Sequence, residues 1–269
     1  MSSEAPNAAD TADTPEAPGP EAPGPEAPGP EAPDAPGAPD APEARLPLRE
    51  RKKLRTRQAL IDTALELFGE HGFDAVTLDR LCETVEVSKR TFFRAFSSKE
   101  DVAMAPTQDL WTAFLDVLEN TPADGRRLME LLEDALAAAI ERMPAEGWTE
   151  RALASRRLAA RTPSMEAHGL AFCDRTTREA MSAMDRRFTL GAPGILDTPG
   201  TPEGTAGTRP TAGLRARLAT DMLVAAFHRA LDGWVAQPTG HTREDLVRRL
   251  RAACAELPGA LAATVQPRG

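Results

Sequence analysis

Between residues 77 and 100, apolar side chains recur at intervals of three and four positions, which is the spacing of one face of an α-helix. The run is interrupted once, at Glu86-Val87, and a residue that caps helices well stands before each half, Thr77 before the first and Ser88 before the second. The pattern therefore predicts two short helices joined by a tight turn, a helix-turn-helix. The apolar positions are Leu78, Leu81, Cys82 and Val85 in the first helix and Phe92 and Phe96 in the second.

The exposed first turn of the second helix carries two cations and a hydroxyl group. A recognition helix presents this end to base edges in the major groove, while the helix before it crosses the sugar-phosphate backbone. We therefore predict that Lys89, Arg90 and Thr91 contact bases. Thr77 and Lys99 are predicted to anchor phosphates, because each stands at the start of a helix, where backbone N–H groups are free.

A longer amphipathic helix is predicted before this segment, over residues 49–70. Gly72 follows it as a stop, since glycine readily takes the backbone conformation that ends a helix. With the two shorter helices, it predicts a three-helix domain at the N-terminal side of the folded chain. The apolar positions of the long helix are Leu54, Ile61, Leu65 and Phe68.

Several short motifs of this segment stand at the positions of a known family. They are Ala64-Leu65-Glu66-Leu67-Phe68, His71-Gly72-Phe73, Thr77, Val87-Ser88, Thr91-Phe92-Phe93-Arg94, Phe96 and Ser98-Lys99-Glu100. On these motifs, residues 49 to about 102 resemble the DNA-binding domain of the TetR (tetracycline-repressor-like) family of transcriptional regulators. The resemblance implies a homodimeric repressor that binds a palindromic operator in double-stranded DNA. It also implies a variable helical domain behind this one, in which a small-molecule effector binds and releases the protein from DNA.

Two positions depart from the family pattern. Glu86 stands in the turn where relatives usually carry glycine, and a non-glycine residue in a left-handed turn costs about 1 kcal/mol. Phe93 stands where relatives usually carry a tyrosine whose hydroxyl meets a phosphate. We therefore predict that Phe93 packs against a sugar or a thymine methyl group.

Helical periodicity continues to about residue 262, and no strand pattern occurs. The sequence thus predicts an all-α protein in three parts. These parts are a tail rich in proline, alanine, glutamate and glycine at 1–44, a helix-turn-helix DNA-binding domain at 45–104, and a helical ligand-binding and dimerisation domain at 105–262.

Prolines and glycines predict where the later helices break. Pro106 should kink or restart one helix, and Pro163 should stop another, so that Ser164 caps the next. Pro258 should end the last helix. Residues 191–213 hold glycine, proline or threonine at most positions, which predicts a flexible loop.

The large apolar residues of the second domain fit two interpretations. Aromatic side chains and flexible methionines suit an irregular ligand space between helices, and the same residues suit an ordinary packed core. The predicted pocket positions are Trp111, Phe114, Phe172, Met181, Met184 and Phe227.

A homodimer is also predicted from the limits of one helix-turn-helix. A single copy reads only a few base pairs, so specificity over a genome requires two copies about one turn of DNA apart. Residues 214–257 are apolar over more than one helical face, which suits an isologous four-helix bundle between two subunits. The apolar positions in the first of these two helices include Leu218, Met222, Ala225, Phe227 and Trp234.

Charge is divided unevenly along the chain. The formal net charge is -9, yet residues 1–44 hold ten acidic residues and no Lys or Arg, so the rest carries about +1. Residues 45–57 contain seven basic residues and one acid, and all four lysines lie in the predicted DNA-binding domain. Proline and glycine density predicts a disordered tail, which either solubilises the protein or competes with DNA for the basic segment.

Other classes of protein find little support in the sequence. No catalytic motif occurs, the three cysteines lack metal-ligand spacing, and no signal peptide or membrane span is evident, which predicts a cytoplasmic protein that is not an enzyme and needs no cofactor or metal. Two alternatives to a ligand-released repressor stay open. One is an activator or a ligand-independent regulator, and the other is a protein-interaction module that has lost DNA binding.

Overall fold

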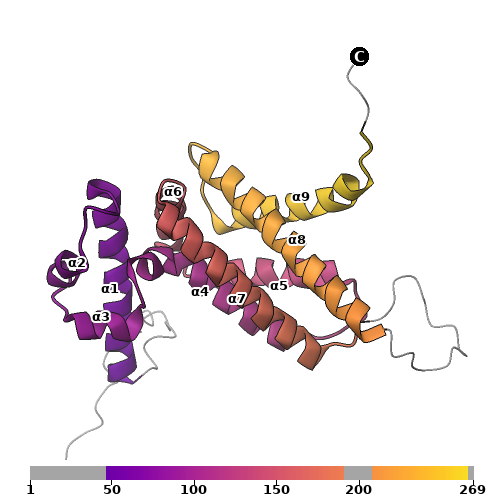
Figure 1. Ribbon diagram of the computed structural model, residues 1–269, viewed down its shortest axis with the longest axis horizontal. Helices are drawn as coiled ribbons and strands as arrows, with labels where there is room; N and C mark the ends of the chain where they lie inside the picture. The colour runs from indigo at the N-terminus through magenta and orange to yellow at the C-terminus, as the bar shows by residue number, and fades with distance from the viewer. Residues whose placement is uncertain (1–46, 191–207, 266–269) are drawn as a thin grey trace, which may run out of the picture. The chain divides into compact units, whose positions relative to one another are not determined.

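The computed structural model describes residues 47–190 and 208–265, which form nine α-helices and no strand (Figure 1). The predicted all-α class is confirmed. The predicted tail at 1–44 and the predicted loop at 191–207 lie outside the described residues. The helices are α1 (Leu48–His71), α2 (Leu78–Thr84), α3 (Lys89–Ala95), α4 (Lys99–Asn120), α5 (Leu128–Arg142), α6 (Trp148–Ala159), α7 (Pro163–Arg187), α8 (Thr208–Ala236) and α9 (Arg243–Ala262).

Local side-chain signals set the ends of the N-terminal helices. Thr77, Ser88 and Ser98 each accept a hydrogen bond from the backbone N–H three residues ahead, at 3.2, 3.1 and 3.1 Å. These bonds satisfy N–H groups that a helix start leaves without an intrahelical partner. Gly72 ends α1 with a φ of 86°, a conformation that favours glycine. The predicted caps at Thr77 and Ser88 and the predicted stop at Gly72 are therefore confirmed.

Two apolar cores meet in α4. The first turns of α4, at Val102, Ala103 and Ala105, pack with α1, α2 and α3 and with Leu158 and Met165. The rest of α4 packs with the helices that follow it. Helix α4 is continuous across residue 104, where the sequence places a domain boundary, so one helix links the helix-turn-helix to the C-terminal helices α4–α9.

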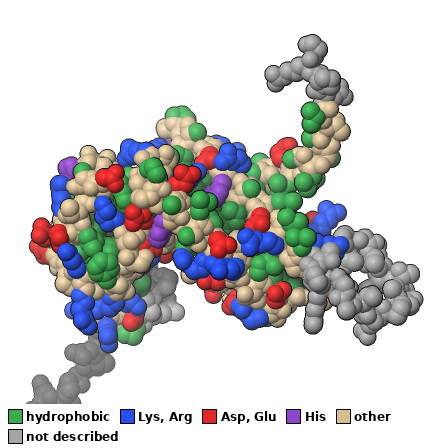
Figure 2. All heavy atoms as spheres, in the orientation of Figure 1, with side chains coloured by type: hydrophobic (Ala, Val, Ile, Leu, Met, Phe, Trp, Pro, Cys, Tyr) green, Lys and Arg blue, Asp and Glu red, His purple; other side chains and the backbone are tan. Residues whose placement is uncertain are grey.

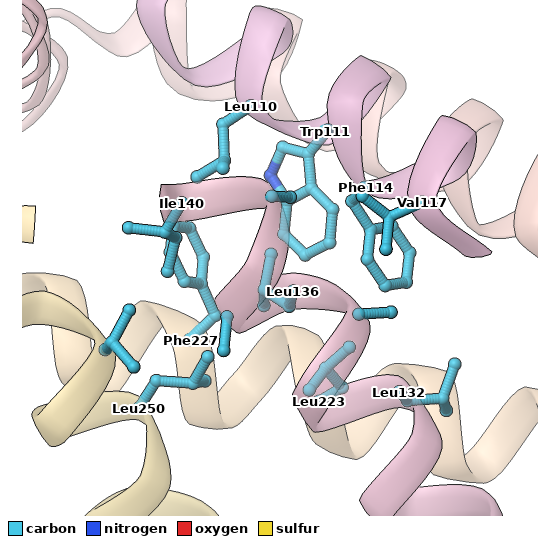
Figure 3. Packing of buried hydrophobic residues seen from close by; sticks show 14 of the residues in the cluster. Leu110, Trp111, Phe114, Val117, Leu132, Leu136, Ile140, Leu223, Phe227 and Leu250 are labelled. Atoms are coloured by element: carbon cyan, nitrogen blue, oxygen red, sulfur yellow. The ribbon is translucent and has the colours of Figure 1, made fainter. Parts of the chain in front are cut away.

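Aromatic and aliphatic side chains pack together in the larger core, as Figure 3 shows. The ring of Trp111 lies edge-on to those of Phe114 and Phe227, with centroids 5.4 and 5.3 Å apart. Leu136 and Ile140 of α5 point into the same space. The core therefore joins α4, α5 and α8 through close side-chain packing.

The structure corrects parts of the predictions about proline. Helix α4 runs through Pro106 without a break, and the indole N–H of Trp148 donates to the Pro106 carbonyl at 3.1 Å. The helix before Pro163 does stop, since α6 ends at Ala159. Pro163 itself begins α7, because the missing N–H of proline costs nothing in a first turn. The cap position therefore belongs to Thr162 and not to Ser164. Helix α9 likewise continues through Pro258 to Ala262.

Two further expectations about the later helices are corrected. Residues 208–213, predicted as the end of the loop, are the first turns of α8. Leu54, predicted on the buried face of α1, is exposed, because nothing in the described residues covers that part of the helix. No helix in the described ranges is long and apolar enough to cross a membrane.

Candidate nucleic-acid interface

Helix α3 is only seven residues long and is held by one buried ring. Phe92 has no exposed surface and packs against Phe96, with ring centroids 5.7 Å apart. Because Phe92 fixes the inner face, Lys89, Arg90 and Phe93 lie on the exposed side of α3. The structure thus brings the predicted base-reading positions to one surface.

Thr91 and Thr77 are partly engaged in capping. The Thr91 hydroxyl lies 3.0 Å from that of Ser88, and Thr91 is half-buried. The Thr77 oxygen accepts from the backbone N–H of Arg80, which leaves its hydroxyl hydrogen free to donate. Thr77 is exposed and can meet a phosphate without losing its cap bond.

The turn between α2 and α3 has the left-handed geometry that the sequence implies. Glu86 has a φ of 56°, the single positive value at a non-glycine residue within the described ranges. Val87 then donates from its backbone N–H to the Cys82 carbonyl at 2.9 Å, which closes the C-terminus of α2. The left-handed turn therefore forms with glutamate at position 86, and the backbone of Glu86 is strained.

Lys89 is paired within the chain. Its ammonium lies 2.6 Å from the carboxylate of Asp79 in α2, and both side chains are exposed. The hydrogen bond to Asp79 and then the charge of Asp79 raise the pKa of Lys89. Lys89 is thus a fixed cation on the outer surface of α2 and α3.

Lys99, predicted to anchor a phosphate, is half-buried. Its ammonium donates to the carbonyls of Phe73 and Val76 at 2.8 and 2.7 Å, and it lies 4.5 Å from the ring centroid of Phe73. These contacts tie the start of α4 to the turn before α2. Lys99 therefore supports the position of Thr77, which directly follows Val76.

Phe93 lies on the outer surface with 55% of its area exposed. Its ring meets that of Phe92 edge-on at 5.4 Å, which fixes its orientation. An exposed aromatic ring beside Arg90 offers an apolar contact and no hydrogen bond to DNA.

Sequence reasoning missed a basic hollow beside α3. Its volume is about 650 Å³, and it brings Arg94 of α3 next to Arg49, Lys52 and Lys53 of α1. Figure 2 shows Lys and Arg side chains gathered at the lower left, where α1 begins. The sequence signals the basic run, but only the fold joins Arg94 to it. The other lining residues are Leu48, Glu50 and Thr56.

Arg57, at the end of the basic run, has a structural role. Its guanidinium forms two hydrogen bonds with the carboxylate of Asp109, at 2.9 and 2.8 Å. It also lies over the ring of Phe96, 5.1 Å from the centroid. Arg57 therefore fastens α1 to α4 and is not free for DNA.

The predicted pocket residues are divided between a core and a small cavity. Phe227, Met184, Trp111 and Phe114 are buried, while Phe172 and Met181 are half-buried. Trp111, Phe114 and Phe172 line a cavity of about 10 Å³ between α4, α7 and α8, which has room for about one water molecule. The core interpretation fits the described conformation. The cavity is also lined by Cys173, Thr176, Thr177, Ala180, Thr220 and Val224.

A family model described as bacterial regulatory proteins of the tetR family matches residues 60–105. These residues include the buried end of α1, the whole of α2 and α3, and the first turns of α4. The match therefore covers the helix-turn-helix and the helix that links it to the rest of the chain.

Two relatives extend this match. The HTH-type transcriptional regulator TcmR of Streptomyces glaucescens is 41% identical over 128 residues, which are 46% of this chain and 56% of that protein. The HTH-type transcriptional repressor AcnR of Corynebacterium diphtheriae is 32% identical over 81 residues, 30% of this chain and 40% of that protein. The chain thus spans about half the length of these relatives.

A solved structure, the fatty acid degradation regulator FadR from Bacillus halodurans, matches 78% of this chain and 97% of its own, at 16% identity and a TM-score of 0.47.

Proposed function

We propose that this chain, whose residues 60–105 match the tetR family of bacterial regulatory proteins, is a homodimeric repressor of that family that leaves a palindromic operator when a small molecule binds. The observation that carries the proposal is the exposed, basic first turn of α3. Lys89, Arg90 and Thr91 contact bases, and Phe93 packs against a sugar or a thymine methyl group. The relative AcnR, a transcriptional repressor, supports the sign of regulation.

Phosphate contacts lie on either side of α3 in this proposal. Thr77 anchors one phosphate from the start of α2, and the basic hollow at Arg94 holds another. Lys99, predicted to anchor a phosphate itself, acts instead by holding the turn at Val76, because its ammonium already donates to two carbonyls. It is a positioning residue for Thr77.

The homodimer uses the outer face of α8. Leu214 and Leu218 are 58% and 47% exposed, and Ala225 continues the same face, so a second copy would cover apolar area that is in water here. Phe227 and Trp234, predicted to contribute, are instead buried inside their own subunit. Leu218→Asp should therefore dissociate the dimer in sedimentation, whereas Leu170→Asp, an exposed leucine of α7, should not.

The effector enters between α4, α7 and α8 at the small cavity beside Phe172. Pockets for small molecules have volumes of about 300–1,000 Å³, so binding at this cavity of about 10 Å³ requires α7 and α8 to separate. Helix α4 carries this change to the helix-turn-helix. Val224→Phe should fill the cavity, keep DNA binding, and abolish release by any member of a compound panel that releases the wild type.

Selection of bound sequences from a random DNA pool tests the proposal. A palindromic motif is expected, since two symmetric copies read two half-sites. Arg90→Ala should lower specific affinity by about 1–3 kcal/mol and relax one position in each half-site. The matched control is Arg94→Ala, which should weaken binding to all sequences alike and leave the motif unchanged. Failure to enrich any motif would contradict sequence-specific regulation.

A further inference from the structure

The ion pair between Lys89 and Asp79 lies at the edge of the surface that we assign to DNA. Lys89 is the first residue of α3, and Asp79 is the second residue of α2. Their charged atoms are 2.6 Å apart, although the two side chains are 54% and 61% exposed. Exposed ion pairs contribute little to folding, because water solvates both groups almost as well. The ion pair therefore affects the binding of Lys89 to DNA more than it affects the stability of the fold.

An unpaired lysine on this surface would weaken discrimination between sequences. The ammonium is a compact charge on a flexible stem, and it binds any phosphate within reach. Phosphate contacts supply nearly all of the affinity for random DNA. A free Lys89 would thus strengthen binding everywhere, without regard to the base sequence.

Asp79 changes both the position and the availability of this cation. An ammonium has three hydrogen-bond donors, so one bond to Asp79 leaves two that can reach base acceptors. A phosphate of random DNA would have to replace Asp79, exchanging one anion for another with little net gain. A guanine edge in the operator does not have to displace Asp79, because its acceptors can bind the ammonium of Lys89 while Asp79 stays bound.

We infer that Asp79 is a specificity-determining residue, which holds Lys89 toward the base edges and withholds it from the phosphates of random DNA. The inference rests on the proposed function, since it assigns a role within the same DNA-binding surface. Asp79 acts through Lys89 and is a positioning residue. It follows that removing its charge makes DNA binding tighter and less selective.

The test compares Asp79→Asn with a matched loss of charge. Asp79→Asn should tighten binding to a random duplex about three- to tenfold at low salt and steepen the salt dependence by about one phosphate contact. In selection from a random pool, it should also lose preference at one position in each half-site. Asp74→Asn removes the same charge from the turn before α2, where Asp74 forms no ion pair with the described residues. This control should leave the motif unchanged and shift random-duplex affinity less.

A second background shows whether Asp79 acts through Lys89. In Lys89→Ala protein, adding Asp79→Asn should change neither the motif nor random-duplex affinity beyond the shift caused by Asp74→Asn. Circular dichroism confirms that each variant is folded before binding is measured. Equal effects of Asp79→Asn with and without Lys89, or an unchanged motif in Asp79→Asn protein, would overturn the inference. A wild-type protein that selects no motif would instead refute the proposed function itself.

Discussion

The helix-turn-helix region (α1–α3) and the C-terminal helices (α4–α9) end their helices by different means. In the first, hydroxyl caps at Thr77 and Ser88 and a glycine at Gly72 set the boundaries. In the second, α5, α6 and α7 begin without a side-chain cap bond, whereas Ser98 and Thr242 cap α4 and α9. Short helices depend on such local bonds because they bury little surface, whereas long helices are held by packing.

Proline lies inside two of the C-terminal helices. Helix α4 continues past Pro106 and α9 past Pro258, although the sequence predicts a kink or restart at the first and a helix end at the second. Burial of the apolar face of α4 offsets the hydrogen bond that Pro106 cannot donate. The rule that proline interrupts a helix therefore fails where tertiary contacts contribute more free energy than the one backbone hydrogen bond that proline removes.

The largest expected effect comes from breaking the packed core. Phe227→Ala should lower the free energy of unfolding by about 3–5 kcal/mol, because Phe227 is 1% exposed and its ring packs against Trp111. Urea unfolding followed by circular dichroism measures it. The control is Phe93→Ala, an exposed ring of α3, which should change stability by less than about 0.5 kcal/mol and weaken DNA binding. Equal losses of stability would remove the contrast between the two regions.

A smaller loss is expected from replacing Lys99, the half-buried cation at the start of α4 whose ammonium binds the turn before α2. Lys99→Met keeps the apolar stem but leaves the carbonyls of Phe73 and Val76 without their charged donor. Stability should fall by about 2 kcal/mol, the order of magnitude of a lost charged hydrogen bond. Thermal unfolding measures the loss. Lys53→Met, which changes an exposed lysine of α1, should leave the transition where it is, and a matching shift in both variants would contradict the assigned role.

Removing a cap should affect the two regions to different extents. Ser88→Ala and Thr242→Ala each delete a bond to the backbone N–H three residues ahead, and each should cost about 1 kcal/mol. Because α3 is short, Ser88→Ala should also speed amide hydrogen exchange throughout α3. Thr242→Ala should speed exchange only in the first turn of α9, which packs against α8. Uniform exchange along α9 would show that its packing is weaker than we infer.

The smallest expected effect is a gain of stability. Glu86→Gly should raise the free energy of unfolding by about 0.5–1 kcal/mol, because it removes strain at a φ of 56° while adding some chain entropy to the unfolded state. The urea midpoint should rise accordingly. Gly240→Ala is the reciprocal control, since alanine at a φ of 80° should lower the midpoint. A lower midpoint for Glu86→Gly would mean that the glutamate makes a stabilising contact.

The candidate site was predictable in its local parts. Helical spacing and capping residues located α2 and α3, and the exposed positions of Lys89, Arg90 and Phe93 follow from the buried ring of Phe92. The partners of the cations were not predictable. Lys89 meets Asp79 ten positions away, and Lys99 meets Phe73 at a separation of 26, because only the folded turns bring these groups together.

By itself, the sequence determined the all-α class, the caps at Thr77 and Ser88, and the basic segment before α2, because each depends on residues within a few positions of one another. Tertiary structure alone decided that prolines lie inside α4 and α9, that Phe227 faces its own core, and that Arg94 joins the basic residues of α1. These outcomes depend on which surfaces meet in space. Side chains that are neighbours in the sequence can stabilise the start of a helix. Burying a helix that contains proline, or pairing a cation, requires side chains that are distant in the sequence.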